Sequence, residues 1–225
     1  VGGIDQCVTE FMRVTDKLHP YSVFLRYSPE LQNEGDLKGR TRAGTPVFFQ
    51  LLGGQAQPLA ENAARVAELG APGVDLNFGC PAKTVNRHDG GATLLKCPER
   101  IQNILEAVRK AVPARVPVTA KIRLGFDDPS FCLAIAQATE AGGANKLTVH
   151  CRTKTDGYRP PAYWDWIPKM KSLTKIPIVA NGEIWTVEDF HRCLELTQCD
   201  EFMIGRGAIA NPYLFHQIKA SLATK

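Results

Sequence analysis

The chain has 225 residues, of which 44% are hydrophobic and 22% are charged, and its net charge is +4. This is ordinary globular composition, and the mild positive charge permits a polyanionic partner without requiring one. No apolar run approaches the ~18 residues of a membrane-spanning helix, so we expect no membrane segment. The seven cysteines form no CxxC pair, which excludes a zinc ribbon or disulfide scaffold and favours the reducing cytoplasm.

Short strand-like segments alternate with longer helical ones along the chain. Runs of β-branched and apolar residues predict seven strands, at 7–14, 46–53, 73–79, 118–125, 146–152, 176–183 and 201–207. Between strands, apolar residues recur at helical spacing, as from Leu59 to Val66, where Gly70 can end the helix. A second helix begins with Pro98, and a third begins at Thr186 in a near-capping-box arrangement.

This alternation predicts an α/β fold with a parallel sheet. Seven strands leave two architectures open: an open doubly wound sheet, or a (β/α) barrel, which needs eight strands, with one strand missing. Polar residues at the strand ends, and the lack of a GxGxxG after the first strand, favour the barrel. The chain has no signal peptide and no initiator methionine, so we expect residues 1–225 to be one partial barrel from a longer protein. The irregular segment 20–45 is predicted to be a functional excursion.

A cysteine stands at one of these strand ends. Cys80 follows the predicted strand 73–79 and precedes Pro81, which can neither continue a helix nor donate to a sheet ladder. The thiol is therefore predicted to lie at the rim of the scaffold, where it is available for chemistry.

Several other strand ends carry side chains suited to an anionic or aromatic ligand. Lys121 is predicted to point into the barrel, either in a buried ion pair or, as we favour, toward an anion or cofactor. His150 either has a structural role or faces the same ligand, and Gln50 suits the imide edge of a flavin or pyrimidine. The last two strand–loop units form a predicted phosphate site, which comprises Asn181, Gly182, Gly205, Arg206 and Gly207.

Residues 152–166 mix basic and aromatic side chains. The pattern suits phosphate contacts and base stacking, with Tyr158 as a candidate, although a solvated loop is the alternative. For Trp164 and Trp166 we favour anchoring of the next helix. His191 and Cys193 match no ligand spacing, so we predict helix packing there and no metal site.

Five motifs in this chain resemble the tRNA-dihydrouridine synthases, flavin enzymes that reduce a uridine of tRNA with NADPH. They are DLNFGCPAKTVN…GGATLL, AKIRLGF, LTVHCRTK…GY, IPIVANGEI and MIGRGA, in the family's order across residues 46–210. CVTEFMRV and the PELQN segment are most similar to the subfamily that acts on position 16 of the D-loop, called DusC. The resemblance implies an FMN-binding (β/α)8 TIM barrel. The chain then lacks the family's first strand and helix and its C-terminal helical tRNA-binding domain.

The resemblance also implies roles for individual residues. Cys80 matches the catalytic cysteine, and Asn77 matches a residue that holds the target uracil. Arg13 and Tyr158 match positions that touch tRNA near the active site. Positions matching the family's contacts to FMN are Gln50, Lys121 and His150 for the ring and ribityl chain, and Asn181, Gly182, Glu183, Gly205 and Arg206 for the phosphate.

The implied chemistry suits a thiol at position 80. Reduced flavin delivers hydride to C6 of uracil, and C5 then needs a proton from the opposite face. A thiol, with an unperturbed pKa of about 8.5, stays mostly protonated near neutrality yet can release its proton. Lys121 would stabilise negative charge on the reduced cofactor. The implied partners are FMN, NADPH and tRNA, and we expect a cytoplasmic monomer.

Two other classes of function remain open from the sequence. One is an FMN barrel that acts on a free pyrimidine, similar to dihydroorotate dehydrogenase, which gives no reason for the basic and aromatic loop. The other is a non-catalytic RNA-binding barrel that has lost its flavin, against which Cys80, Lys121 and Arg206 argue. Binding of tRNA separates the first, and a yellow colour on purification separates the second.

Overall fold

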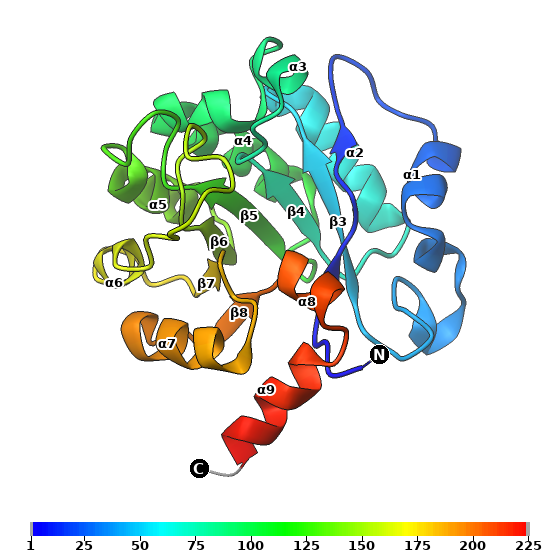
Figure 1. Cartoon of the computed structure of the whole chain (residues 1–225). Helices are drawn as coiled ribbons and strands as arrows, with labels where there is room; N and C mark the ends of the chain where they lie inside the picture. Colours follow the sequence, from blue (N-terminus) through cyan, green and yellow to red (C-terminus); the bar gives the residue numbers. More distant parts are fainter. Residues whose placement is uncertain (1, 224–225) are drawn as a thin grey trace.

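The computed structural model of the chain describes residues 2–223. Within them, parallel strands form one sheet in the order β1-β3-β4-β5-β6-β7-β8, and β2 also pairs with β3 (Figure 1). The strands are β1 Cys7–Val8, β2 Met12–Arg13, β3 Val47–Leu52, β4 Val74–Asn77, β5 Val118–Arg123, β6 Lys146–His150, β7 Ile178–Asn181 and β8 Glu201–Met203. Each strand from β3 onward therefore pairs with the next one along the chain, as a (β/α) repeat requires.

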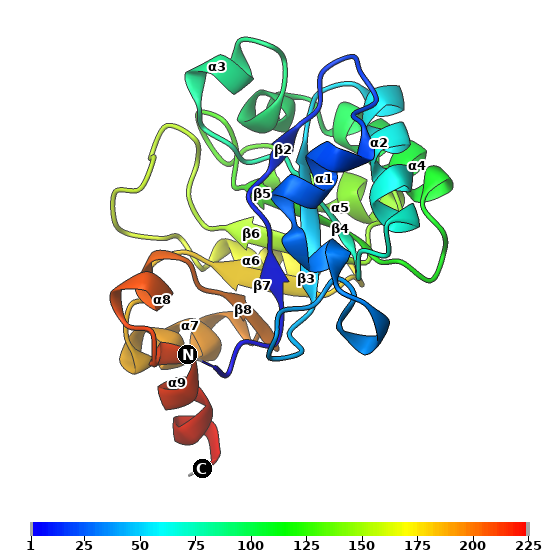
Figure 2. The same cartoon turned by 90° about the vertical axis from the view of Figure 1, so that its right-hand side faces the viewer.

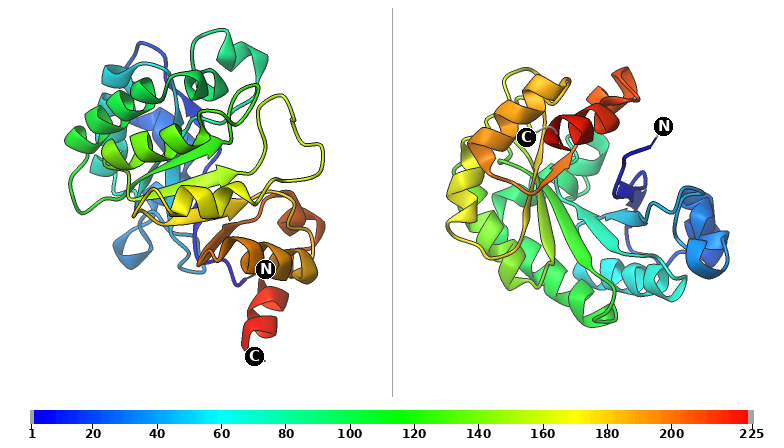
Figure 3. Two further views of the ribbon diagram at one scale, coloured as in Figure 1. Left: turned by 90° about the vertical axis from the view of Figure 1, so that its left-hand side faces the viewer. Right: turned by 90° about the horizontal axis from the view of Figure 1, so that it is seen from below.

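Amphipathic helices cover the outer face of this curved sheet in chain order (Figure 3). They are α2 Ala56–Glu68, α4 Pro98–Ala111, α5 Cys132–Ala141, α6 Trp166–Lys171 and α7 Val187–Thr197. The predicted helix signals are confirmed: Gly70 has φ +88° directly after α2, and Pro98 begins α4. Thr186 and Asp189 form a full capping box at the start of α7.

The remaining elements lie outside the alternating strands and helices of this repeat. They are α1 Tyr21–Tyr27, α3 Lys83–Asn86, α8 Arg206–Ala210 and α9 Leu214–Ala223, with 3-10 turns η1 Pro29–Gln32, η2 Gly35–Leu37 and η3 Gly91–Lys96. No ladder joins β8 to β1 among residues 2–223, so the sheet is an open, barrel-like arc (Figure 3). The predicted parallel α/β barrel architecture is confirmed in this form.

The predicted strand 7–14 is wrong as a single strand, because the structure splits it into β1 and β2 along β3 (Figure 2). Cys7 pairs with Val47, but Met12 pairs with Leu51, so the first strand holds one extra residue between the two ladders. This is a β-bulge. At the bulge, the hydroxyl of Thr9 accepts a hydrogen bond from the Gln50 backbone N–H at 3.0 Å.

Two further predictions need correction. The predicted strand 201–207 ends at Met203, because α8 begins at Arg206. The segment 20–45 is not wholly irregular, since α1 and two 3-10 turns lie within it, and Phe24 of α1 packs on Phe49 of β3 with ring centroids 5.6 Å apart. Among residues 2–223, no helix is both long enough and apolar enough to cross a bilayer.

Candidate active site

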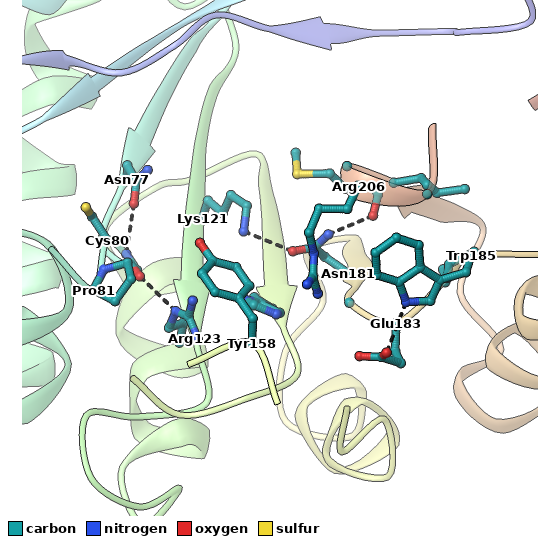
Figure 4. A pocket seen from close by; sticks show the side chains of 18 of the residues that line it. Asn77, Cys80, Pro81, Lys121, Arg123, Tyr158, Asn181, Glu183, Trp185 and Arg206 are labelled. Atoms are coloured by element: carbon teal, nitrogen blue, oxygen red, sulfur yellow. Dashed lines mark hydrogen bonds between the residues drawn. The ribbon is translucent and has the colours of Figure 1, made fainter. Parts of the chain in front are cut away.

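A pocket of about 310 Å³ lies at the carboxyl ends of the strands (Figure 4). This is the end at which barrel proteins place their chemistry. Its lining combines cationic, amide, aromatic and thiol side chains, including Asn77, Cys80, Lys121, Arg123, His150, Tyr158, Asn181, Glu183, Trp185 and Arg206. Strands β4 to β8 and the loops that follow them supply these groups.

The backbone around Cys80 is held on both sides. Gly79 donates its N–H to Asn77 Oδ1 at 3.0 Å, and its carbonyl accepts from Arg123 Nε at 3.0 Å (Figure 4). The Cys80 carbonyl accepts from Asn86 Nδ2 and from the Ala92 backbone N–H, both at 3.1 Å. The Gly79 N–H and the carbonyls of Gly79 and Cys80 therefore all have hydrogen-bond partners in the surrounding structure.

The glycine pair after this loop lets the chain pass close behind the cysteine. Gly91 has φ +60°, and a Cβ there would lie 2.8 Å from the Cys80 carbonyl oxygen and 2.9 Å from a Val85 methyl carbon. Only glycine fits both the conformation and the space. The motif from Cys80 to Gly91 therefore forms one packed loop that carries the thiol.

The Cys80 side chain is 7% exposed and packs with Leu52 and Val85. Phe11, in the bulge between β1 and β2, packs against the same cluster and lines the pocket. Bulges commonly re-aim a side chain next to an active site. The bulge thus gives the thiol an apolar wall.

Lys121 lies inside the barrel opening and donates to Asn181 Oδ1 at 3.1 Å (Figure 4). Asn181 Nδ2 in turn donates to the Met203 carbonyl at 2.8 Å, which fixes the orientation of that amide. Burial and the positive charge of Arg123 lower the pKa of Lys121 from 10.5 to about 8, although the negative charge of Asp75 opposes the shift. Lys121 therefore remains mostly protonated at neutral pH.

Arg123 shares the pocket face with Lys121 and fixes the loop 152–159. Its Nη1 donates to the carbonyls of Thr153 and Gly157 at 2.9 and 2.8 Å. Its guanidinium lies 5.2 Å from the Tyr158 ring centroid. A cation–π contact with Arg123 therefore holds the Tyr158 ring against the pocket.

Six side chains form a closed ring of contacts on the side of the pocket that holds Arg206. Arg206 lies between the rings of Tyr158 and Trp185, with its guanidinium 4.9 Å from each centroid. Trp185 Nε1 donates to Glu183 Oε1 at 3.0 Å (Figure 4). The other Glu183 oxygen pairs with the fully buried Arg152. Arg206 is therefore held by aromatic rings, and the Glu183 carboxylate is occupied by Arg152.

The ring closes through His150, which is 6% exposed. Arg152 Nη1 lies 3.2 Å from His150 Nε2, and the His150 ring lies 5.9 Å from the Tyr158 ring. Burial, together with Lys121 and three arginines, lowers the pKa of His150 to about 2, so the imidazole is neutral. Because an arginine can only donate, Nε2 accepts and the proton resides on Nδ1.

Ten of the twelve site residues expected from the sequence line this one pocket. Gln50 does not line it: it is 6% exposed and its amide bonds to Asp75 and Asn77 beneath the pocket. Arg13 lines a separate depression, also about 310 Å³, with Gly54. Their expected contacts with flavin and tRNA stay predictions.

Sequence reasoning missed the roles of Phe11, Arg123, Arg152 and Trp185 in this pocket. Arg123 could have been found, because it shares strand parity with Lys121. The bulge and the aromatic contacts of Arg206 leave no periodic signal. Among residues 2–223, no cluster of three histidine, cysteine or carboxylate side chains could hold a metal ion.

The fold and the pocket define a (β/α)-barrel protein whose site lies at the carboxyl ends of its strands. The model of the family "Dihydrouridine synthase (Dus)" matches residues 1–225, and the chain belongs to that family. The predicted family is therefore confirmed.

Relatives with closely similar sequences carry the name tRNA-dihydrouridine(16) synthase. The protein from Pseudomonas syringae pv. tomato is 54% identical over 98% of this chain and 68% of its own length. The one from Ralstonia nicotianae is 52% identical over 99% of this chain and 67% of its own. The chain thus spans about two thirds of the length of these relatives.

Solved structures support the fold alone. Histamine dehydrogenase from Rhizobium sp. 4-9 superposes with a TM-score of 0.61 at 14% identity, covering 94% of this chain and 41% of its own. A 2-naphthoyl-CoA reductase complex superposes with a TM-score of 0.58 at 17% identity, covering 74% of this chain and 29% of its own. Identities this low show shared architecture only.

Proposed function

We propose that this chain is the catalytic barrel of a tRNA-dihydrouridine synthase that reduces the uridine at position 16 of tRNA. Family membership and relatives of this name at about 50% identity support the reaction and the position. We further propose FMN as the cofactor, NADPH as the reductant, and a monomer in the cytoplasm. The observation that carries the proposal is a pocket that gathers a thiol, a polar amide and unpaired cations.

The charge balance of the pocket fits FMN. Among residues 2–223, no carboxylate forms an ion pair with Lys121, Arg123 or Arg206. Arg123 is buried and Lys121 is half-buried, whereas Arg206 is exposed. Cations that are removed from water without carboxylate partners favour an anionic ligand. Arg206 and the backbone of Gly205 would hold the phosphate, and Lys121 would face the ring.

The remaining side chains would handle the base and its proton. FMN, when reduced, would supply the hydride to C6 of uracil. Cys80 would then donate its thiol proton to C5, so that one hydride and one proton saturate the C5=C6 bond. Asn77, which lines the pocket beside Cys80, would hold the uracil by its amide. Tyr158, 56% exposed at the rim, and Arg13 would contact the tRNA around a base flipped out of its stack.

One direct assay tests this proposal against action on a free pyrimidine. The protein is incubated anaerobically with FMN and NADPH, and with tRNA, uridine or orotate in parallel. Oxidation of NADPH that depends on tRNA, with dihydrouridine detected in the tRNA by mass spectrometry, is the expected result. Turnover with a free pyrimidine and none with tRNA would contradict the proposal.

Arg206→Ala is expected to weaken FMN binding by about tenfold to a hundredfold, the range for one charge-assisted contact. The aromatic rings that hold Arg206 keep its charge available for the phosphate. The measurement is quenching of flavin fluorescence on titration with protein. Arg159→Ala is the control, since Arg159 is exposed and does not line the pocket. Equal affinity of the Arg206 variant and wild type would contradict a phosphate role.

FMN binding is also expected to weaken as the pH rises through about 8. The lowered pKa of Lys121 means that its ammonium is present below about pH 8 and is lost above it. His150, with a pKa of about 2, stays neutral and adds no step near neutrality. The test is the FMN dissociation constant of wild type and Lys121→Met from about pH 6 to pH 9.5. An alkaline loss of affinity that persists in the Lys121→Met variant would assign the titration to another group.

A further inference from the structure

Beneath the pocket, a buried carboxylate begins a directional chain of hydrogen bonds. Asp75 of β4 is 2% exposed and lies between Gln50 of β3 and Thr119 of β5, its partners in the ladder. Gln50 Nε2 donates to Asp75 Oδ2 at 2.6 Å, and Thr119 Oγ1 donates to Oδ1 at 2.5 Å. Neither the thiol chemistry nor the phosphate site uses Asp75 directly, although its negative charge acts on Lys121.

The chain continues upward to the loop that carries the thiol. Asn77 Nδ2 donates to Gln50 Oε1 at 2.9 Å, and Gly79 donates its N–H to Asn77 Oδ1 at 3.0 Å. Every link therefore points its donor toward Asp75. This series of hydrogen bonds ends at Gly79, one residue before Cys80.

The direction of these bonds follows from the accepting carboxyl group at the base. Both Asp75 oxygens accept, Oδ2 from Gln50 and Oδ1 from Thr119, so Gln50 turns Nε2 toward Asp75 and Oε1 toward Asn77. Asn77 must then present Nδ2 to Gln50, which leaves Oδ1 for Gly79. Burial raises the pKa of Asp75 above its ordinary value, and the bonds from Thr119 and Gln50 and the charge of Lys121 oppose that rise only in part.

We propose that Asp75 is a positioning residue, which acts through Gln50 and Asn77 to fix the polarity of the Asn77 amide and the turn before Cys80. With this polarity, Asn77 still has one N–H and one oxygen lone pair for the pocket. Such a pair complements the adjacent N–H and C=O of a uracil imide edge. The link to uracil rests on the proposed function, whereas the direction of the hydrogen bonds from Gly79 to Asp75 does not.

Asp75→Asn tests the proposal because it keeps size and shape but removes the fixed polarity. The introduced amide can donate to Gln50 Oε1. The side-chain amides of Gln50 and Asn77 can then both rotate by 180° and exchange their donor and acceptor ends. Gly79 N–H then loses its acceptor for part of the time. We expect the Gly79 amide to exchange with solvent about tenfold faster in the flavin-free protein, the factor for one net hydrogen bond.

Two further variants separate polarity from general loosening. Gln50→Met interrupts the series of hydrogen bonds while keeping Asp75. The Gly79 amide is expected to lose protection from hydrogen exchange as it does in Asp75→Asn. If Asp75→Asn fails to fold, Gln50→Met alone decides the question. Thr119→Val removes one hydrogen bond to Asp75 but leaves the bonds among Asp75, Gln50, Asn77 and Gly79 intact. The Gly79 amide should therefore keep its protection from hydrogen exchange. Amides of α4 serve as the internal reference for global stability.

The outcomes are distinct. Faster exchange of Gly79 in Asp75→Asn and Gln50→Met, but not in Thr119→Val, supports the proposal. Unchanged exchange in both of the first two variants, or equal loss in all three, would overturn it. In the loaded enzyme, we expect Asp75→Asn to lower kcat about tenfold or more with little change in KM for tRNA. If wild type itself reduces no tRNA, the proposed function fails while the exchange result still stands.

Discussion

Replacing Cys80 with alanine is expected to slow reduction of tRNA uridine by about 10²–10⁴-fold, the contribution of a positioned general acid. FMN binding and oxidation of NADPH should remain nearly intact, because neither step needs the proton donor. Cys80→Ser should be almost as slow, since a hydroxyl is a far weaker acid than a thiol. Both variants should fold, because each removes or exchanges only the sulfur atom of a side chain that lines the pocket.

The measurement is anaerobic and separates the two half-reactions. The flavin is first reduced with NADPH, tRNA is then added, and reoxidation of the flavin is followed by absorbance. Cys97→Ala is the matched control, because Cys97 is a partly exposed cysteine that does not line the pocket. If the Cys80→Ala enzyme reoxidises on tRNA at the wild-type rate and forms dihydrouridine, then Cys80 is not the proton donor.

Glu183→Ala is expected to lower the free energy of unfolding by about 3 kcal/mol, because it leaves the buried Arg152 without its counter-ion. Arg152 is fully buried and the Glu183 side chain is 26% exposed, so water compensates only part of the loss. Glu183 has φ +59°, and alanine keeps that backbone cost. The difference in the free energy of unfolding between wild type and Glu183→Ala therefore measures the contribution of the Glu183 side chain alone.

Urea unfolding measures this effect directly. Glu183→Gln should lose less, because its one amide oxygen can still accept from either Trp185 or Arg152, although not from both. Glu195→Ala, on the exposed face of α7, should change stability by less than about 0.5 kcal/mol. A loss below about 1 kcal/mol in Glu183→Ala would place the pair among ordinary surface salt bridges.

The parts of the site that follow from strand periodicity could be predicted from the sequence. A short strand that ends in Gly79, Cys80 and Pro81 puts the thiol at a strand end, and the parity of β5 turns Lys121 inward. Because the ends of parallel strands meet, these residues converge in one pocket whatever the loop details.

The rest depends on contacts between segments distant in the sequence. The bulge that aims Phe11 at Cys80 arises from one extra residue between β1 and β2, which the pattern of CVTEFMRV does not show. Glu183 was expected at the phosphate, but its carboxylate pairs with Arg152, thirty-one residues earlier. Gln50 bonds to Asp75 and Asn77 through the two ends of its amide, and its expected contact with the flavin stays a prediction.

The central claim is that this protein forms dihydrouridine at position 16 of tRNA, as the names of its relatives state for them. The most direct test is to map dihydrouridine in tRNA from cells in which the gene for this chain is disrupted. Dihydrouridine at position 16 should be absent, and it should return when the wild-type gene is restored but not when the gene carries Cys80→Ala. Full dihydrouridine at position 16 in the disrupted strain would contradict the account.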